Sequence, residues 1–228
     1  MTLQDTLFDL VPLTRKARYH NPKLQGQYIY GDARNISLDQ LGGIPFNAVI
    51  ADPPWEFEIW SVKGNAKTSY DLLSLDDICS IPVQDIATKD SVLFLWSTNP
   101  KLKEALQVID AWGFNYRTKF PWIKTTENHQ LEYGIGYWVR GISEDIMIAT
   151  RGKISAPRLE GFLGLIGPNI EHSRKPQDIH YLAESTTPGP HLEIFGRYQR
   201  PGWVVFGNDN RGLQPPDIRP SRTPSWLR

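Results

Sequence analysis

The sequence Asp-Pro-Pro-Trp at residues 52–55 directly follows six mostly apolar residues, 46–51. The apolar run predicts a buried strand, and the two prolines force the chain to leave that strand in a rigid, extended turn. A polar turn after a buried strand is typical of α/β sheets, which bring such residues to the carboxyl ends of their strands, where ligands bind. The chain is therefore expected to adopt an α/β fold with a site at residues 52–55.

The chemistry of this turn favours a ligand that donates hydrogen bonds. Proline has no N–H group, so we expect the carbonyl oxygens of Pro53 and Pro54 to lack adjacent donors. Asp52 adds a carboxylate acceptor, and Trp55 offers a flat face on which a base can stack. Together they suit an amino group on a planar heterocycle such as adenine. The alternative is a plain strand-terminating turn with Trp55 in the core.

Composition limits the classes to which the chain can belong. Its 228 residues suffice for one α/β domain. The 25 Lys and Arg balance the 25 Asp and Glu, so any contact with nucleic acid must come from a local cluster or a partner. One cysteine, Cys79, excludes an internal disulfide framework and fits a reducing compartment. The five histidines lack metal-ligand spacing, so no metal is expected. Without a signal peptide or a membrane-length apolar stretch, we expect a cytoplasmic protein with no membrane partner.

The pattern along the chain predicts an N-terminal arm at 1–25, one domain at 26–210 and a proline-rich tail at 211–228. Strands and helices alternate, which predicts a mostly parallel sheet. The expected strands are 28–30, 46–51, 91–96, 114–123 interrupted at Pro121, 145–150, 192–195 and 204–206. The expected helices are 37–41 capped by Ser37, one or two within 76–86, 100–112 ended by Gly113, and 176–184 begun by Pro176. Long loops are expected at 56–73 and 151–172.

Three further polar residues stand at strand or helix ends. Asp32 follows the first strand, where a carboxylate commonly accepts from an adenine amine or a ribose hydroxyl, although Gly-Asp is also a common turn. Lys175 precedes the helix at Pro176, whose N-terminus attracts anions, so Lys175 is placed to hold a carboxylate or phosphate, or else forms a basic helix start without a ligand. Glu193 lies in an apolar strand, where an unpaired carboxylate is costly. It either pairs with a cation such as Arg197 or holds a ligand hydroxyl or ammonium.

With these motifs in this order, the chain resembles the MT-A70 family of adenine N6 methyltransferases, which use S-adenosylmethionine. The resemblance runs from about Tyr28 to Asn210. Beside Asp-Pro-Pro-Trp, it rests on Gly-Asp at 31–32, Trp-Ile-Lys at 122–124, Gly-Tyr-Trp-Val-Arg at 136–140, His-Ser-Arg-Lys-Pro at 172–176, Leu-Glu-Ile-Phe-Gly-Arg at 192–197 and Gly-Asn at 207–208. The motif order is similar to that of the permuted, β-type amino-methyltransferases, and the chain is most similar to the bacterial and phage branch.

The resemblance implies a role for each motif residue. Asp52 and a carbonyl of Pro53 or Pro54 would hold the target amine, and Trp55 would stack on the flipped adenine. The remaining roles fall on two sides of the site. On the cofactor side, Asp32 and the backbone of Ala33 would read the adenine, Lys175 would pair with the methionine carboxylate, Arg197, Asn208 and Asp209 would hold the ribose, and Asp52, Glu193 and Phe195 would complete the site. On the substrate side, Tyr70 and Glu144 would line the acceptor site and Arg140 would contact the nucleic acid.

The resemblance also implies the fold and the partners. We expect a Rossmann-like methyltransferase fold with helices on both faces of a mostly parallel sheet. The expected substrate is DNA rather than RNA, the expected product of the cofactor is S-adenosylhomocysteine, and a homodimer or a partner subunit is plausible. Relatives often carry a histidine where this chain has Ser143, which leaves the contact there open. Two alternatives stand beside the DNA enzyme: the same reaction on RNA, and a catalytically silent subunit that binds nucleic acid.

Overall fold

The structure is a computed structural model and describes residues 26–56, 71–127, 130–134, 138–155, 164–170, 174–213 and 215. The arm expected at 1–25 and the loop residues 57–70 lie outside the described residues, as does most of the tail expected at 211–228.

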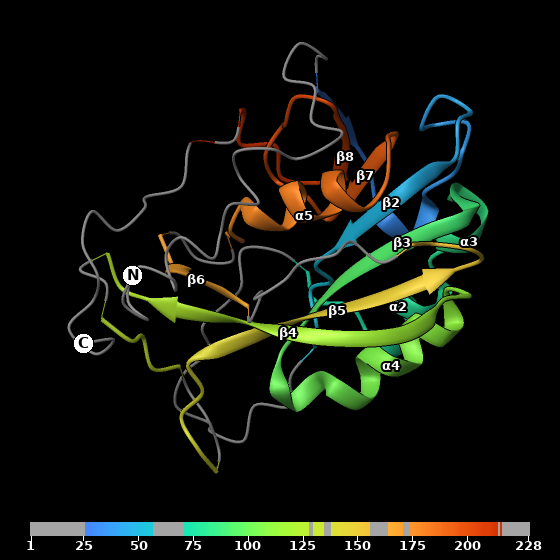
Figure 1. Cartoon of the computed structure of the whole chain (residues 1–228). Coiled ribbons are helices and arrows are strands. Elements are labelled where there is room, and N and C mark those ends of the chain that lie inside the picture. The colour runs from blue at the N-terminus through green and yellow to red at the C-terminus, as the bar shows by residue number, and fades with distance from the viewer. Residues whose placement is uncertain are drawn as a thin grey trace.

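Eight strands form one sheet (Figure 1), in the order β1-β8-β7-β2-β3-β5-β4-β6. Their bounds are β1 Gln27–Tyr30, β2 Phe46–Ala51, β3 Ala87–Ser97, β4 Asn115–Thr125, β5 Ser143–Arg151, β6 Leu165–Pro168, β7 His191–Ile194 and β8 Trp203–Gly207. Within the described residues, five of the seven neighbouring pairs are parallel, and both antiparallel pairs involve β5. The mostly parallel sheet expected from the sequence is confirmed.

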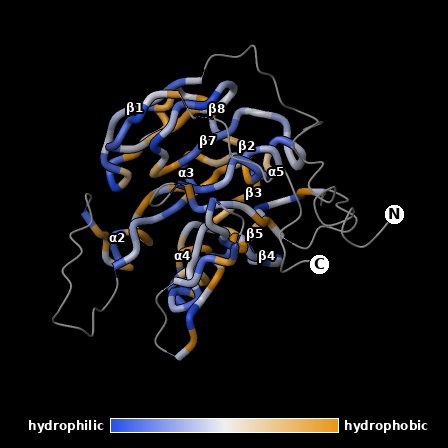
Figure 2. Tube along the Cα trace, turned by 90° about the vertical axis from the view of Figure 1, so that its left-hand side faces the viewer, coloured by the Kyte–Doolittle hydropathy of each residue, from blue (hydrophilic) through white to orange (hydrophobic). Residues whose placement is uncertain are grey.

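Helices cover both faces of this sheet, and each face has its own buried cluster (Figure 1). The alternation of side chains along a strand sends Val49 of β2 to one face and Ile50 to the other. Helices α2 Leu75–Ser80, α3 Val83–Ile86 and α4 Leu102–Ala111 pack on the face of Val49, and α5 Asp178–Thr186 packs on the face of Ile50. Hydrophobic residues gather on the central strands and on the helices against them (Figure 2). The fold is Rossmann-like, as expected.

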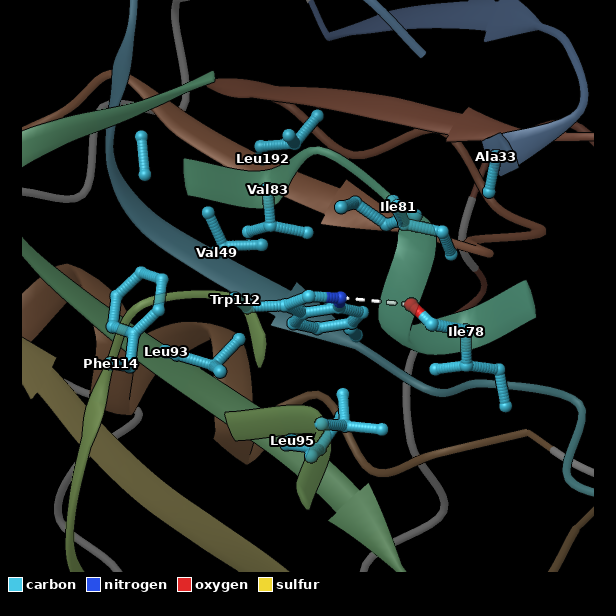
Figure 3. Packing of buried hydrophobic residues seen from close by; sticks show 14 of the residues in the cluster. Ala33, Val49, Ile78, Ile81, Val83, Leu93, Leu95, Trp112, Phe114 and Leu192 are labelled. Carbon is cyan, nitrogen blue, oxygen red and sulfur yellow. Dashed lines mark hydrogen bonds between the residues drawn. The ribbon is translucent and has the colours of Figure 1, made fainter. Parts of the chain in front are cut away.

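Trp112 ties the first helical layer together. Its indole is fully buried and donates a hydrogen bond of 2.9 Å to the carbonyl oxygen of Ile78 in α2 (Figure 3). Gly113 follows with a φ of 76°, a conformation that glycine adopts without steric cost and that ends α4 as predicted. The helix pair within 76–86, broken at Pro82, is also confirmed, with Ser74 capping α2 through the amide of Asp77.

Two expectations based on prolines were wrong, one for Pro121 and one for Pro176. Pro121 does not interrupt β4, because β6 pairs with β4 only from Trp122 onward and the missing N–H at Pro121 is tolerated there. Pro176 does not begin a helix: Gln177 is the N-cap of α5, and the helix runs from Asp178.

Two short segments also differ from expectation. Residues 37–41 form turns rather than a helix, although Ser37 does accept from the amide of Gln40. The long loop expected at 151–172 contains β6, which pairs with β4 and whose four residues carry too little periodicity to be recognised in the sequence. Among the described residues, no helix combines the length and the apolar character needed to cross a bilayer.

We predict that Trp112→Ala lowers the free energy of unfolding by about 3–5 kcal/mol, because it empties a buried site and leaves the Ile78 carbonyl without its indole donor. Urea denaturation followed by circular dichroism measures this loss. Trp138→Ala is the matched control: its side chain is 91% exposed, so we expect a change below about 0.5 kcal/mol. Equal losses in the two variants would contradict the packing described above.

Candidate active site

Residues 52–55 leave the carboxyl end of β2, between β7 and β3, as the sequence predicts. The carboxylate of Asp52 is 29% exposed, while Pro53 and Trp55 are buried. Trp55 lies in the core cluster that faces α2 and α4, and its indole donates to the carbonyl oxygen of Trp96 at 3.3 Å. The stacking role of Trp55 stays a prediction, and its observed contacts fix the turn against β3.

The expectation that the proline carbonyls lack adjacent donors was wrong. The Pro53 oxygen accepts from the amide of Trp55, and the Pro54 oxygen accepts from the amide of Leu73, each at 2.9 Å. The sequence could not indicate the second contact, because Leu73 comes 19 positions after Pro54. A carbonyl oxygen has two lone pairs, so each can still accept one hydrogen bond from a ligand.

Lys175 connects the Asp52 carboxylate to a second carboxylate, that of Glu144 at the start of β5. The Nζ atom of Lys175 lies 2.7 Å from Asp52 Oδ2 and 3.1 Å from Glu144 Oε2. It also lies 5.3 Å from the centre of the Trp96 ring, so an aromatic face supports the ammonium from β3. The structure thus brings together three of the predicted site residues, Asp52, Glu144 and Lys175.

A second lysine, for which the sequence predicts no role, completes this cluster. The Nζ atom of Lys124 on β4 bonds to the other oxygen of Glu144 and lies 5.0 Å from the Trp122 ring. Trp122 and Trp96 meet edge to face, so two tryptophans lie beneath two ammonium groups. The one signal in the sequence is the motif Trp-Ile-Lys at 122–124, which belongs to the family pattern.

Burial and charge set the ionisation of this cluster. Burial raises the pKa of Asp52, the attraction of Lys175 only partly opposes that shift, and the charge of Glu144 adds to it. Burial alone would raise the pKa of Glu144, but Lys175 and Lys124 outweigh it and the pKa is lowered. Burial would lower the pKa of Lys175, yet its two carboxylate partners raise it. Lys175 is therefore an ammonium at neutral pH, and Asp52 is the group whose ionisation is most readily changed.

A second group of predicted residues lies at the ends of β1, β7 and β8. Asp32 follows β1, where it accepts from the amide of Arg34 and pairs with its guanidinium at 2.6 Å, which lowers the pKa of Asp32. Ala33 next to it is buried. Arg197 after β7 lies 3.7 Å from the carboxylate of Asp209 after β8, and Asn208 is exposed beside Asp209.

Tyr28 of β1 holds these strand ends in register. Its hydroxyl donates to the Gly196 carbonyl at 2.9 Å and accepts from the Asp209 amide at 3.2 Å. Burial raises the pKa of Tyr28 to about 12, so the hydroxyl stays protonated. A side chain at Gly196 would come within 2.3 Å of Val205, so only glycine fits there, and Phe195 before it has a φ of 66°, in the left-handed region that is costly for a bulky side chain. The turn after β7 is thus strained and close-packed, as is common where the backbone holds a ligand.

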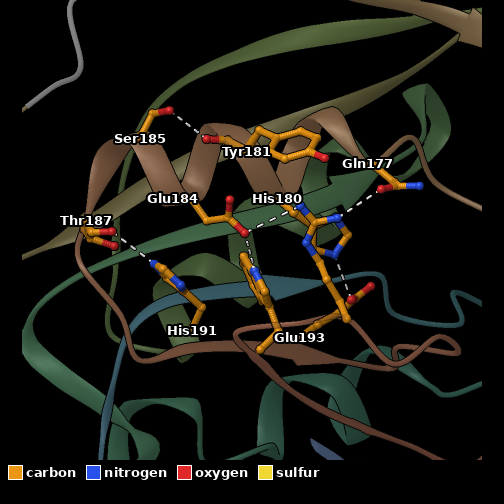
Figure 4. Close-up of polar contacts among 10 residues, drawn as sticks. Gln177, His180, Tyr181, Glu184, Ser185, Thr187, His191 and Glu193 are labelled. Atoms are coloured by element: carbon orange, nitrogen blue, oxygen red, sulfur yellow. Dashed lines mark hydrogen bonds and ion pairs between the residues drawn. The ribbon is translucent and has the colours of Figure 1, made fainter. Parts of the chain in front are cut away.

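Glu193 of β7 has a partner that the sequence did not indicate. Its Oε2 atom lies 2.8 Å from Nε2 of His180, a buried residue of α5 (Figure 4). Further along α5, Glu184 accepts from the indole of Trp203 at 2.7 Å and pairs with Arg200 at 3.5 Å. These contacts between helix and strands fix the element that follows Lys175 and explain how Glu193 is accommodated in an apolar strand.

The remaining predicted residues lie near the site or outside the described residues. Arg140 is exposed in the segment that joins β4 to β5 and donates to the carbonyls of Tyr133 and Gly134. Ser143 begins β5 beside Glu144. Tyr70 lies outside the described residues, so its role stays a prediction. Among the side chains that the structure describes, no group of three or more His, Cys, Asp or Glu is arranged to hold a metal ion.

Comparison with known proteins gives a family match. A family model described as MT-A70 matches residues 46–209, which include β2, the Asp52 turn, Lys175, β8 and Asp209 after it. The matched range is 164 of 228 residues (209 − 46 + 1), more than half of the chain.

Individual relatives are similar at lower identity. The N(6)-adenosine-methyltransferase MT-A70-like protein of Arabidopsis thaliana is 25% identical over 195 residues, covering 83% of this chain and 27% of its own length. The human N(6)-adenosine-methyltransferase catalytic subunit METTL3 is 27% identical, covering 84% of this chain and 33% of its own length. The type II methyltransferase M.MunI of Mycoplasma is 26% identical, covering 78% of this chain and 81% of its own length. The chain therefore spans a third or less of the two adenosine methyltransferases and most of the type II methyltransferase.

We predict that Lys175→Met destabilises the fold increasingly as pH rises. Without the ammonium, the partly buried Asp52 faces Glu144 and loses the charge that opposes the rise of its pKa, while Glu144 keeps Lys124 as a partner. The folded state then binds the proton of Asp52 more tightly than the unfolded state, so stability is lost as pH rises through the raised pKa of Asp52. Between about pH 5 and pH 8, the loss in free energy of unfolding relative to wild type should grow to about 2–4 kcal/mol. This loss is smaller than that for breaking a fully buried pair, because Asp52 is partly exposed.

Chemical denaturation at the two pH values measures this deficit. The matched control is Lys101→Met, which removes the partner of Glu104 from a pair at the start of α4. That loss should stay below about 1 kcal/mol and should not grow with pH. A deficit for Lys175→Met that is independent of pH would show that the two carboxylates do not depend on this ammonium.

Proposed function

Because the chain belongs to the MT-A70 family, we propose that it transfers a methyl group from S-adenosylmethionine to the N6 amine of adenine in DNA. The observation that carries the proposal is the cluster of Asp52, Lys175 and Glu144 at the carboxyl edge of β2, inside the range that the family model matches. The relatives named N(6)-adenosine-methyltransferases support the choice of acceptor atom.

The residues present fit the proposed cofactor by the chemistry of their donor set. S-adenosylmethionine supplies a methyl group on a positively charged sulfur. An ammonium has three N–H donors, and two carboxylates occupy two of those on Lys175, so one is available for the carboxylate of the methionine part. Asp52 would take its ammonium, and the Asp32 and Asp209 ends of β1 and β8 would take the adenine amine and the ribose. Phe195 and Arg197 lie in the strained turn between those ends.

Asp52 and the prolines would prepare the amine for transfer. The lone pair of an adenine amine is delocalised into the ring, which makes the nitrogen a poor nucleophile. Acceptors that bind both N–H groups favour a pyramidal nitrogen whose lone pair points at the methyl group. The ionised carboxylate of Asp52 would be one acceptor, and the remaining lone pair on the Pro53 or Pro54 oxygen would be the other. Positioning supplies most of the acceleration in such a displacement.

The target base must reach this turn from outside a duplex. Unstacking a base costs a few kcal/mol, and a single-stranded substrate avoids that cost. Glu144 would line the acceptor side beside Asp52.

Because RNA and DNA share the adenine amine, the turn at residues 52–55 does not distinguish the two nucleic acids. We place DNA first because the chain is similar to a type II methyltransferase over most of both chains. RNA is the second candidate, supported by the adenosine methyltransferases.

We predict that Asp52→Asn lowers the rate of methyl transfer at least about 100-fold, because an amide accepts the amine more weakly than a carboxylate and presents its own donors. Incorporation of tritiated methyl groups into duplex DNA, single-stranded DNA and RNA measures the rate. Asp110→Asn is the control, since Asp110 is exposed on α4, on the outer side of the helical layer. Full activity of Asp52→Asn would remove Asp52 from the reaction, and no incorporation by the wild type would leave only the silent subunit.

Lys175→Ala should raise the dissociation constant of the cofactor about 10-fold or more, because the methionine carboxylate loses its charged partner. Calorimetry with S-adenosylhomocysteine measures the change, and Lys101→Ala on α4 should bind as the wild type does. An unchanged constant for Lys175→Ala would mean that the methionine end lies elsewhere.

A further inference from the structure

The segment that joins β4 to β5 exposes large side chains next to the candidate active site. Trp138 is 91% exposed, Val139 76% and Tyr133 55%. Single exposed apolar residues are common, but neighbouring ones of this size mark a surface that binds something. None of the roles argued above accounts for them.

Backbone hydrogen bonds tie this segment to the catalytic cluster. The amide of Lys124 donates to Ile142 at 2.7 Å, and its carbonyl accepts from Glu132 at 3.0 Å. Further out, the amide of Gly134 donates to Gly141 at 2.7 Å. The ammonium of Lys124 bonds to Glu144. The segment that carries the exposed side chains is therefore hydrogen-bonded to a residue of the candidate site. Trp138 is six residues before Glu144, within about 20 Å along the chain.

Arg140 adds a flat cation to this surface. Its guanidinium lies 5.5 Å from the centre of the Tyr133 ring and donates to the carbonyls of Tyr133 and Gly134. Arg140 is thus exposed but held beside the ring of Tyr133. Aromatic rings and guanidinium planes are the groups on which unpaired bases stack, and the guanidinium also neutralises phosphate.

We propose that Trp138, together with Tyr133 and Arg140 of the same segment, binds the nucleotide adjacent to the target adenine, with Trp138 stacking on its base. This inference rests on the proposed function, because it assumes that a base of a nucleic acid enters at Asp52. It also answers a question raised by the neutral net charge of the chain: without a broadly basic surface, affinity for nucleic acid must come from a local contact, and stacking does not depend on net charge.

A second copy of the chain is a weaker candidate for the occupant. A stable dimer buries about 800 Å² per partner, while an aromatic side chain supplies about 150–250 Å². Tyr133, Trp138 and Val139 together fall short of that area.

The test compares Trp138→Phe with Trp138→Leu, which share a similar bulk but differ in the aromatic face. Fluorescence anisotropy with short labelled oligonucleotides of mixed sequence, as single-stranded DNA and as RNA, gives the dissociation constants. We expect Trp138→Leu to bind about 10-fold more weakly than the wild type and Trp138→Phe to stay within about twofold of it. Tyr116→Leu, which removes a 41% exposed aromatic residue at the opposite end of β4, should change nothing.

Several results would overturn the inference. Equal affinity of the Leu and Phe variants would exclude stacking, and absence of binding by the wild type would exclude the surface altogether. A lower molar mass of Trp138→Leu in sedimentation would assign the surface to a second copy. S-adenosylhomocysteine binding should be the same in all variants, which shows that they fold. Binding is measured without turnover, so the two proposals can fail separately. If the wild type transfers methyl groups but Trp138→Leu binds oligonucleotides as tightly as the wild type, only the inference about Trp138 is wrong. If binding depends on the aromatic side chain but the wild type transfers no methyl group, only the proposed methyl transfer is wrong.

Discussion

The ammonium of Lys175 holds two carboxylates that would otherwise repel each other. Asp52 leaves the end of β2 and Glu144 begins β5, so the lysine joins two strands and the segment before α5 at one point. Partial burial strengthens these interactions relative to water, and it makes the charge on Asp52 dependent on its neighbours. If Lys175 also binds the cofactor, as proposed, binding on one side of Asp52 alters the acceptor strength on the other. Cofactor and amine would then be coupled electrostatically, without any movement of the backbone.

The position of Lys175 depends in turn on the packing of α5. Glu184 reaches from that helix to Trp203 and Arg200, and His180 reaches to Glu193. Buried polar contacts of this kind lower the stability of the fold when a group lacks its partner, and they favour one packing arrangement when all partners are present. They connect the helix to β7 and β8, whose ends carry the residues proposed to hold the ribose. The two halves of the site therefore share one rigid support.

Local rules recovered most of the fold from the sequence, and they failed where long-range pairing decided the outcome. The apolar run before Asp52, the α4 helix ended by Gly113 and the helix pair around Pro82 all carry strong local signals. The four residues of β6 carry none, and Pro121 is tolerated only because its neighbouring strand begins one residue later. Within the site, the resemblance indicated Asp52, Glu144 and Lys175, but the contacts of Lys124 and His180 join residues 20 and 13 positions apart. Spacing in the sequence holds no signal for such pairs, and the same is true of the amide of Leu73 that donates to Pro54.

The reversed direction of β5 has a consequence for how such a protein can diversify. In a fully parallel sheet, the connection after each strand must return across the whole domain before the next strand begins. Here β4 ends and β5 starts at the same edge, so the connection between them, which bears Trp138, leaves and rejoins the sheet beside the cluster of Lys124, Glu144 and Lys175. Its length and composition can change without altering any strand register. A single scaffold could in this way acquire new preferences for neighbouring sequence while its chemistry stays constant.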